Sequence, residues 1–312
     1  MSAEIFVALS TFAKYGDAPL KLLKNSGFTH SLNPLGRRLV KNEIIKMGKD
    51  CKGIIAGVEP YDKYVLENMP DLLCISRCGA GIDNIDQEVA RRRHVEIRNT
   101  PDVVIQPAVE LTVAMIFNLL RKLTIHTVLL KAKKWKKKAG NLLIGKKVGI
   151  LGLGRIGKKV AETLLKLDAQ VYGADLFPDI HWAEEMGVNI VSTDELLRIS
   201  DIVSIHLSFL KENPFFLSEK EISGMKRGAM VINVSRGHFV DETALFNALK
   251  SGQLCGAALD VFPEEPYAGK LCELENVILT PHIATLTEES RQQMELEAVQ
   301  NLIDVLKVQL NV

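Results

Sequence analysis

The sequence is poor in cysteine and has no cysteine spacing that would build a cross-linked or zinc-bound domain. Its five cysteines are odd in number and none form a CxxC pair; they are Cys51, Cys74, Cys78, Cys255 and Cys272. This pattern argues against a disulfide framework and against a tetrahedral zinc site. We therefore expect reduced thiols, no metal and a function that rests on other side chains.

Long apolar runs and an excess of one charge are also missing. No segment approaches about 18 uninterrupted apolar residues, and residues 1–10 lack the basic and long apolar stretches of a secretory signal. Lys and Arg number 39 and Asp and Glu number 38, so the formal charge is +1. Such a chain has no global field that attracts nucleic acid or an anionic membrane. We expect a cytoplasmic protein with neither partner.

What the sequence does contain is the alternation of an α/β protein. At 312 residues, with 47% apolar and 25% charged residues, the chain is long enough for two domains. One series of strand-like runs comprises IFVAL, GIIAGV, LLCISRC and VEIRN; a second comprises KKVGILGLG, AQVYGAD, IVSIHL, MVINVS, CGAALDV and VILTPH. Helical stretches separate these runs, which predicts two lobes, each a doubly wound parallel sheet.

Two long helical segments lie outside this alternation. The apolar stretch at 103–130 predicts one helix joining the lobes, with Pro107 near its start, where a helix tolerates proline. Residues 288–308 have helical periodicity, and no further strand follows them. We expect this last helix to pack back on the first lobe.

A glycine-rich motif follows the apolar run VGIL and opens a predicted helix. Its glycines stand where a tight turn, a close approach to pyrophosphate and close helix–strand packing are needed. The helix N-terminus adds unpaired N–H groups for phosphate oxygens. The predicted cofactor-binding residues here are Gly152, Gly154, Arg155, Ile156 and Gly157. The alternative is a turn in which glycine serves packing alone.

An acidic residue completes this pattern. Asp175 lies at the end of the run QVYGAD, about 20 residues beyond the motif, where it can accept hydrogen bonds from ribose hydroxyls. It also repels a 2′-phosphate, and the following Leu176 and Phe177 supply no cation. The sequence therefore predicts NAD rather than NADP.

From about residue 77 onward, the sequence resembles the D-2-hydroxyacid dehydrogenases, and most closely their phosphoglycerate dehydrogenase branch. The motifs that carry the resemblance are RCGAGIDNID (77–86), NTPDVVIQPAVE (99–110), GILGLGRIG (149–157), NVSRG (233–237), ALDVFPEEP (258–266) and TPHIA (280–284). The resemblance implies a Rossmann NAD-binding domain at 100–281, inserted into a flavodoxin-like substrate-binding domain at 1–99 plus 282–312. It also implies a homodimer and a catalytic cleft between the lobes.

Three catalytic residues are predicted from this resemblance. Reduction of a 2-keto acid needs a cation for the carboxylate, an acid for the developing alkoxide and a group that tunes the acid. Arg236, Glu265 and His282 stand where the family carries its Arg, Glu and His. Glu264 does not immediately precede the proline, so we expect it to be solvated. A structural ion-pair network is the alternative for the three.

The remaining predicted contacts also come from the resemblance. Asp260 stands where the family holds the nicotinamide carboxamide, and the amides of Ala80 and Gly81 are implied to hold the substrate carboxylate. Arg77 and Asn99 are either further substrate contacts or residues that satisfy a turn. His206 matches a family histidine that we expect to serve packing.

One segment is strongly basic, and another departs from the family. The run KAKKWKKK at 131–138 has two interpretations. It is a solvated face, or it helps to gather a phosphorylated substrate, either within one chain or across a dimer interface. At His206 the family usually has HLPLT and a second threonine, whereas this chain reads HLSFLKENPFF, with Ser208, Leu210 and Asn213 at those places. The sequence also leads us to expect no serine-regulated C-terminal domain.

Three functional interpretations follow. The first is a 3-phosphoglycerate dehydrogenase or a relative acting on a similar 2-hydroxy or 2-keto acid. The second is a glyoxylate, hydroxypyruvate or D-lactate-type reductase that uses the same residues. The third is an NAD(H)-sensing binding protein, like the transcriptional corepressors that share these motifs. The motifs do not separate the first two.

Overall fold

The chain divides into two compact units, each with its own parallel sheet. The computed structural model describes residues 4–208 and 217–311. One unit contains residues up to Val104 together with the segment from Thr285 onward, and the other is Ile105–Ala284. The predicted boundaries were 99/100 and 281/282, so both divisions fall a few residues later. This shift places His282 in the central unit, together with Arg236 and Glu265.

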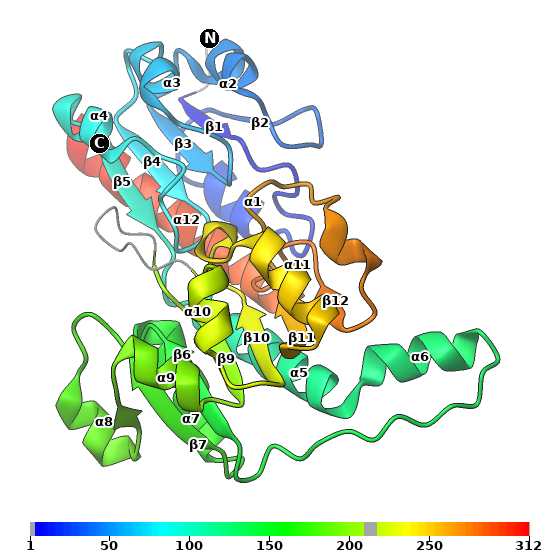
Figure 1. Ribbon diagram of the computed structural model, residues 1–312. Helices are drawn as coiled ribbons and strands as arrows, with labels where there is room; N and C mark the ends of the chain where they lie inside the picture. Colours follow the sequence, from blue (N-terminus) through cyan, green and yellow to red (C-terminus); the bar gives the residue numbers. More distant parts are fainter. Residues whose placement is uncertain (1–3, 209–216, 312) are drawn as a thin grey trace. The chain divides into compact units, whose positions relative to one another are not determined.

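The first unit is built on a five-stranded sheet (Figure 1). All its strands are parallel in the order β2-β1-β3-β4-β5, the flavodoxin-like order. The central strands read as continuous apolar runs because helices cover both faces of such a sheet. The strands are β1 (Ile5–Val7), β2 (His30–Leu32), β3 (Gly53–Ala56), β4 (Cys74–Arg77) and β5 (Glu96–Asn99).

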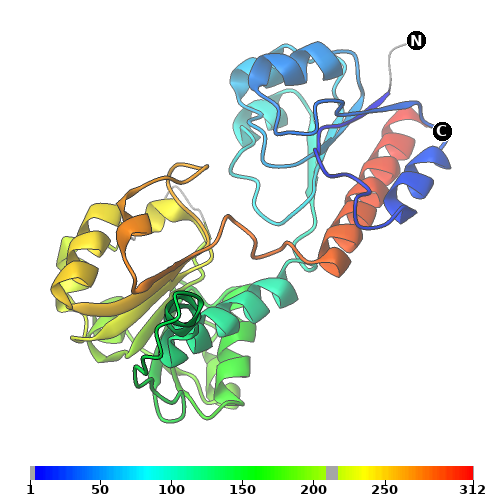
Figure 2. The ribbon, with the colours of Figure 1, turned by 90° about the vertical axis from the view of Figure 1, so that its right-hand side faces the viewer.

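Five helices complete this unit: α1 (Ala18–Lys24), α2 (Lys41–Gly48), α3 (Lys63–Glu67), α4 (Gln87–Arg92) and α12 (Glu288–Leu310). Figure 2 shows α12 beside α1, and α12 also packs against β3, β4 and β5. Leu302 and Leu306 of α12 approach Gly53 so closely that a Cβ there would lie 2.7 Å from Leu302 Cδ1. The last helix therefore packs on the first sheet, as its apolar periodicity predicts.

The second unit has a seven-stranded parallel sheet in the order β12-β11-β10-β9-β6-β7-β8. Counted from its first strand, this is the Rossmann order, whose switch point lies between β6 and β9. The strands are β6 (Lys147–Leu151), β7 (Gln170–Ala174), β8 (Asn189–Ile190), β9 (Ile202–Ile205), β10 (Ala229–Asn233), β11 (Leu254–Leu259) and β12 (Val277–Leu279). The predicted fold class, two doubly wound parallel sheets of these two types, is confirmed.

Helices flank this sheet, and several begin at a side chain that accepts a hydrogen bond from the first turn. Asp179, Ser192 and Asp241 cap α8, α9 and α11 in this way. The helices are α5 (Ile105–Arg121), α6 (Leu123–Lys131), α7 (Arg155–Leu165), α8 (Ile180–Met186), α9 (Thr193–Ile199), α10 (Glu219–Gly224) and α11 (Glu242–Ser251), with short 3₁₀ turns η1 (Gly237–Phe239) and η2 (Lys270–Glu273).

The prediction of one continuous helix at 103–130 is wrong. Lys122 has φ 55°, a left-handed conformation that ends α5 and starts α6 in a new direction. α5 buries eight residues, whereas α6 buries none. Figure 1 shows α6 and the segment after it projecting away from the sheet of this unit. The apolar pattern therefore continues past the point where core packing stops.

Within residues 4–208 and 217–311, no single helix is long and apolar enough to span a membrane; α5 and α6 reach that length only together and are bent by 62°. Across the same residues, no group of three or more His, Cys, Asp or Glu side chains is arranged to hold a metal ion.

Candidate active site

The glycine-rich turn connects β6 to α7 at the switch point of the second sheet. Gly152 has φ 92°, and a Cβ there would lie 2.8 Å from the carbonyl carbon of His206. A Cβ on Gly157 would lie 1.9 Å from the carbonyl oxygen of Gly152. Glycine is required at both positions by the protein's own backbone, the first for conformation and the second for close packing.

Gly154 differs from both of these glycines. A Cβ at Gly154 would meet no atom within 4 Å, so the protein itself leaves room at this position. Gly154 is the N-cap of α7, and no side chain caps this helix N-terminus. Uncapped N–H groups beside open space fit a pyrophosphate that approaches the backbone closely. Arg155 is exposed and Ile156 half-buried on the same first turn.

Asp175 is joined directly to this turn. Its Oδ2 accepts a hydrogen bond from the Leu153 amide at 2.6 Å, and its Oδ1 accepts one from the Phe177 amide at 2.9 Å. A carboxylate oxygen can accept a second hydrogen bond, so both oxygens keep capacity for ribose hydroxyls. The residues that sequence spacing assigned to NAD therefore lie together and fit a dinucleotide.

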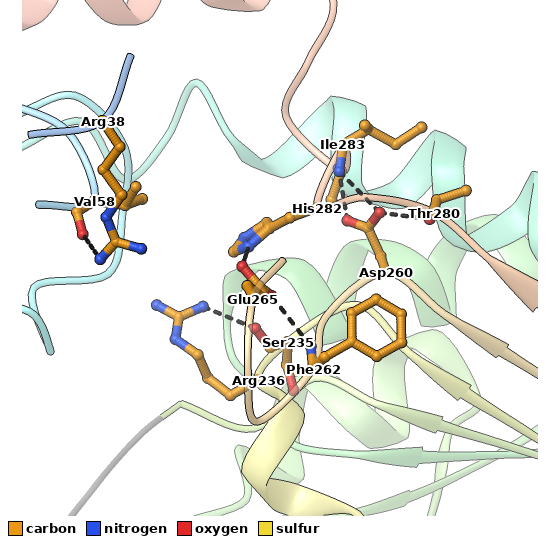
Figure 3. Close-up of polar contacts among 11 residues, drawn as sticks. Arg38, Val58, Ser235, Arg236, Asp260, Phe262, Glu265, Thr280, His282 and Ile283 are labelled. Atoms are coloured by element: carbon orange, nitrogen blue, oxygen red, sulfur yellow. Dashed lines mark hydrogen bonds and ion pairs between the residues drawn. The ribbon is translucent and has the colours of Figure 1, made fainter. Parts of the chain in front are cut away.

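The predicted catalytic residues follow three adjacent strands. Asn233 of β10 is in register with Leu259 of β11, which is in register with Leu279 of β12. Because parallel strands end at the same edge, the segments after them emerge side by side. Arg236 comes from the first segment, Asp260 and Glu265 from the second, and His282 from the third (Figure 3).

Glu265 and His282 form the central pair of this edge. Glu265 Oε2 lies 3.0 Å from His282 Nδ1, and Glu265 Oε1 accepts a hydrogen bond from the Phe262 amide at 3.1 Å. The carboxylate is thus fixed by its own loop and binds one nitrogen of the imidazole. This arrangement leaves Nε2 as the nitrogen that can exchange a proton with a substrate.

Asp260 fixes the backbone that carries His282. It is fully buried, and its carboxylate accepts hydrogen bonds from Thr280 Oγ1 at 2.5 Å and from the amides of Ile283 and Ala284, each at 2.8 Å. Burial raises the pKa of Asp260, and these three donors oppose that rise. The carbonyl oxygen of Asp260 also accepts the His282 amide at 2.9 Å.

His282 itself has φ 55°, in the left-handed region that residues other than glycine rarely adopt. Such a conformation costs roughly 1–3 kcal/mol and persists only where the surroundings hold it. The four hydrogen bonds that Asp260 accepts from 280–284 supply that hold. The observed contacts make Asp260 the support of the histidine loop; its predicted contact with the nicotinamide carboxamide stays a prediction.

Arg236 is placed by a close approach of two backbones. A Cβ on the next residue, Gly237, would lie 1.9 Å from the carbonyl carbon of Phe262, so the loop of Arg236 packs directly on the loop of Glu265. The half-buried guanidinium donates to the Ser235 carbonyl oxygen at 2.8 Å, and Asn233 Nδ2 donates to the Arg236 carbonyl oxygen at 2.8 Å. The structure thus brings the three predicted catalytic residues to one edge.

The predicted carboxylate loop belongs to the first unit and follows β4. Gly79 has φ 132°, its amide donates to Thr100 Oγ1 at 2.8 Å, and its carbonyl oxygen accepts the Thr100 amide at 3.0 Å. Ala80 and Gly81 are half-buried. In the part of the chain that the structure describes, neither of their amides donates a hydrogen bond to a protein group. Both are therefore available to an anion.

Arg77 and Asn99 support this loop through its carbonyl oxygens. Arg77 Nη1 donates to the Cys78 carbonyl oxygen, and Asn99 Nδ2 donates to the Ala80 carbonyl oxygen at 2.6 Å. The Arg77 guanidinium also occupies the position that a Cβ on Gly79 would take. These contacts agree with the alternative in which Arg77 and Asn99 satisfy the hydrogen bonds of a turn. A direct contact of either residue with substrate stays a prediction.

Two further predictions concern His206 and the basic run. His206 is buried at the end of β9, its Nε2 lies 2.8 Å from Ser204 Oγ, and burial lowers its pKa to about 4. Its backbone lies against Gly152 of the glycine-rich turn, and its imidazole is neutral near pH 7.

The run at 131–138 is exposed, including Trp135 at 81% exposure. Leu210 and Asn213 lie outside the described residues.

Sequence reasoning missed the residues that hold the predicted ones in place. Thr100, Gly237 and Thr280 do so through the contacts above, and Asn84 joins two loops of the first unit. Gly237 and Thr280 stand inside the motifs NVSRG and TPHIA, so the motifs contain them. Their supporting roles depend on tertiary contacts that the motifs do not reveal.

A Rossmann sheet, a glycine-rich turn with its acidic partner and a carboxylate–histidine pair define a dinucleotide-binding α/β protein with acid–base capacity. A family model described as D-isomer specific 2-hydroxyacid dehydrogenase, NAD binding domain, matches residues 113–284. The chain belongs to the D-isomer specific 2-hydroxyacid dehydrogenase family, and residues 113–284 are its NAD-binding domain. The predicted family and cofactor are confirmed.

Individual relatives carry different names. D-3-phosphoglycerate dehydrogenase of Pongo abelii is 36% identical over 275 residues, which are 87% of this chain and 52% of that protein. Glyoxylate reductase of Thermococcus litoralis is 37% identical over 261 residues, 80% of this chain and 78% of that protein. A crystal structure of D-lactate dehydrogenase from Aquifex aeolicus, complexed with NAD and lactic acid, has a TM-score of 0.84 at 27% identity and covers 98% of this chain and 96% of that one. This chain spans about half the length of the phosphoglycerate dehydrogenase it matches.

Proposed function

We propose that the protein is an NAD-dependent D-2-hydroxyacid dehydrogenase. When bound, NAD supplies the acceptor or donor of a hydride at the C2 carbon of a 2-hydroxy or 2-keto acid. In the reducing direction C2 gains the hydride while the carbonyl oxygen gains a proton from His282. In the oxidising direction His282 takes that proton back.

The observation that carries this proposal is the 3.0 Å contact between Glu265 Oε2 and His282 Nδ1. The carboxylate holds Nδ1 and keeps the ring oriented, which leaves Nε2 for proton transfer in both directions. Arg236, on the adjacent loop, binds the substrate carboxylate and polarises the carbonyl through charge-assisted hydrogen bonds. A contact of the Ala80 and Gly81 amides with the substrate carboxylate belongs to the same proposal.

For the substrate we propose an acid of the 3-phosphoglycerate type, with glyoxylate, hydroxypyruvate or D-lactate-type acids as the alternative. Similarity to D-3-phosphoglycerate dehydrogenases supports the first, and similarity to a glyoxylate reductase that this chain covers over 78% of its length supports the second. A homodimer and a cytoplasmic location belong to the same proposal. So does a contribution of the 131–138 lysines to binding of a phosphorylated acid; unchanged kcat/KM after their neutralisation would remove it.

The experiment is NADH oxidation with 3-phosphohydroxypyruvate, hydroxypyruvate, glyoxylate and pyruvate, run with wild type and His282→Ala. Turnover of one or more acids by wild type, lost in the variant while NADH still binds, supports the proposal. NADH binding without turnover of any acid would contradict it and favour the NAD(H)-sensing interpretation.

A further inference from the structure

Tyr267 is an aromatic residue close to Glu265 that the catalytic assignment does not use. Its ring stacks on that of Phe262, with the ring centroids 4.0 Å apart and the two planes inclined by 15°. Phe262 is buried and Tyr267 half-buried, whereas the residues between them, 263–266, are exposed. The stacked rings therefore anchor both ends of an exposed loop, and that loop carries Glu265.

Phe262 is the fixed end of this loop. Its ring belongs to a hydrophobic core cluster of the second unit that also contains Leu259 and Leu271. Its backbone lies directly against Gly237, where a Cβ would be 1.9 Å from the Phe262 carbonyl carbon. Its amide donates to Glu265 Oε1 at 3.1 Å, as Figure 3 shows. The ring of Tyr267 ties the other end of the loop to this fixed point, so Glu265 is held from both sides.

A second contact joins Tyr267 to the segment that leads to His282. Tyr267 Oη accepts a hydrogen bond from the Leu271 amide at 3.3 Å, and a Cβ on Gly269 would lie 2.4 Å from that oxygen. Gly269 therefore leaves the room that the hydroxyl occupies. Leu271 is 1% exposed in η2, which precedes β12, and His282 follows β12. Tyr267 thus contacts both the loop of Glu265 and the segment that continues to His282.

Tyr267 acts by position rather than by charge. Burial raises the pKa of its hydroxyl, the charge of Glu242 raises it further, and the hydrogen bond from the Leu271 amide opposes the rise. The side chain therefore stays a neutral phenol near pH 7. Its effect on the site comes from the ring that it stacks on Phe262 and from the hydrogen bond that its oxygen accepts.

We propose that Tyr267 is a positioning residue for proton transfer, which stacks on Phe262 and thereby holds Glu265 where its carboxylate orients the imidazole of His282. The proposal rests on the proposed function, because it places Tyr267 behind the same acid–base pair. Tyr267 touches neither substrate nor cofactor in this role. It sets how well the proton donor is aligned, so its loss should appear in kcat rather than in KM.

The kinetic test compares Tyr267→Ala with Phe246→Ala, which removes an aromatic ring packed against the same core cluster. With the keto acid that wild type reduces, we expect Tyr267→Ala to lower kcat roughly 5- to 20-fold. The KM and the NADH affinity should change less than about twofold, because Arg236 and the glycine-rich turn keep their contacts. Phe246→Ala should keep wild-type kcat.

Two further substitutions at the same position separate the ring from its hydroxyl and from its bulk. Tyr267→Phe keeps the stacked ring and should restore kcat to within about threefold of wild type. Tyr267→Leu keeps apolar bulk but cannot stack, and it should lose kcat as Tyr267→Ala does. The test therefore does not depend on the stability of one variant.

A double-mutant cycle with Glu265→Ala distinguishes positioning from a general loss of packing. If Tyr267 acts through Glu265, Tyr267→Ala should lower kcat less than about twofold once the carboxylate is absent. A loss of the same size in both backgrounds would overturn the proposal. An equal loss in Phe246→Ala, or an unchanged kcat in Tyr267→Ala, would overturn it as well.

Nuclear magnetic resonance of ¹⁵N-labelled histidine separates this proposal from the proposed function. A carboxylate at Nδ1 favours the neutral imidazole tautomer that carries its proton on that nitrogen. The His282 signal is assigned by its absence in His282→Ala, and the tautomer is measured at alkaline pH, where the ring is neutral. We expect Tyr267→Ala and Glu265→Ala both to shift His282 toward the Nε2–H tautomer, and Tyr267→Phe to restore the wild-type spectrum.

The two outcomes of this measurement are independent of turnover. If wild type reduces no acid while the tautomer shifts as expected, the positioning role of Tyr267 stands and the proposed function fails. If wild type reduces a keto acid while Tyr267→Ala leaves the tautomer of His282 unchanged, the proposed function stands and the positioning role fails.

Discussion

The carboxyl edges of the two sheets present different chemistry. In the second unit the edge carries ionisable side chains, with Glu265 paired to His282 and Arg236 on the next loop. In the first unit it carries backbone amides at Ala80 and Gly81, held from behind by side chains. Under the proposed function, the second sheet supplies proton transfer and cofactor binding, while the first supplies anion recognition. Substitutions in the two edges should therefore affect different kinetic constants.

The largest effect should come from the ionisable edge. His282→Ala removes the proton donor and should lower kcat by roughly 10²- to 10⁴-fold, because general acid catalysis contributes on that scale. NADH affinity, measured by fluorescence, should change less than about twofold. His181→Ala, an exposed histidine of the same unit, is the matched control and should keep wild-type turnover. A normal kcat in His282→Ala would show that His282 is not the proton donor.

The glycines of the turn separate cofactor binding from folding. Gly154→Ala should leave thermal stability nearly unchanged, since its Cβ meets nothing within 4 Å, yet weaken NADH binding roughly 10-fold or more by crowding the phosphates. Gly157→Ala places a Cβ 1.9 Å from the Gly152 carbonyl oxygen and should destabilise the unit by several degrees. Calorimetry and NADH titration of both variants check this. Equal losses of stability in the two variants would refute the distinction.

The amide edge should respond in KM rather than in kcat. Asn99→Ala removes the 2.6 Å hydrogen bond to the Ala80 carbonyl oxygen and loosens the loop without touching the proton donor. We expect KM for the keto acid to rise roughly 5- to 20-fold, with kcat and NADH affinity changed less than about threefold. Steady-state kinetics decides the matter. A fall in kcat with constant KM would mean that the loop contributes to the chemical step.

A further effect leaves catalysis aside and concerns the pH dependence of stability. Burial lowers the pKa of His206 from 6.5 to about 4, so the unfolded chain binds this proton more readily than the folded one. The stability linked to this group is fully present above pH 6.5 and is lost as the pH falls toward 4, on the order of 3 kcal/mol in total. His206→Gln should flatten the fall in Tm between pH 6.5 and 4. An unchanged slope would show that His206 titrates normally.

The sequence predicted the second unit in more detail than the first. Its glycines and Asp175 are identified by a short motif and its spacing, and the Glu–His pair by the family resemblance, because each motif spans one strand and the loop after it. The support of those residues depends on contacts between motifs, such as Asp260 with the segment 280–284, or Gly237 against Phe262. No local pattern specifies which two backbones meet.

The first unit shows the same limit more strongly. Asn84 and Thr100 stand inside quoted family motifs, but they act through partners more than 20 residues away, which the motifs do not reveal. The break between α5 and α6 was missed for a related reason. Apolar periodicity reports that side chains can be buried, but not whether a sheet lies beside them to bury them.

In the proposed reaction a hydride moves between the cofactor and C2 of the substrate while His282 gives or takes the proton. The most direct measurement uses NADH deuterated at C4 on the transferring face and follows the label by mass spectrometry and chiral chromatography. The substrate is whichever of 3-phosphohydroxypyruvate, hydroxypyruvate and pyruvate wild type reduces best, because their products are chiral at C2. We expect one deuterium at C2 of the D-2-hydroxy acid, and no labelled product from His282→Ala on the same timescale. Deuterium that remains in the cofactor, or a product of L configuration, would contradict it.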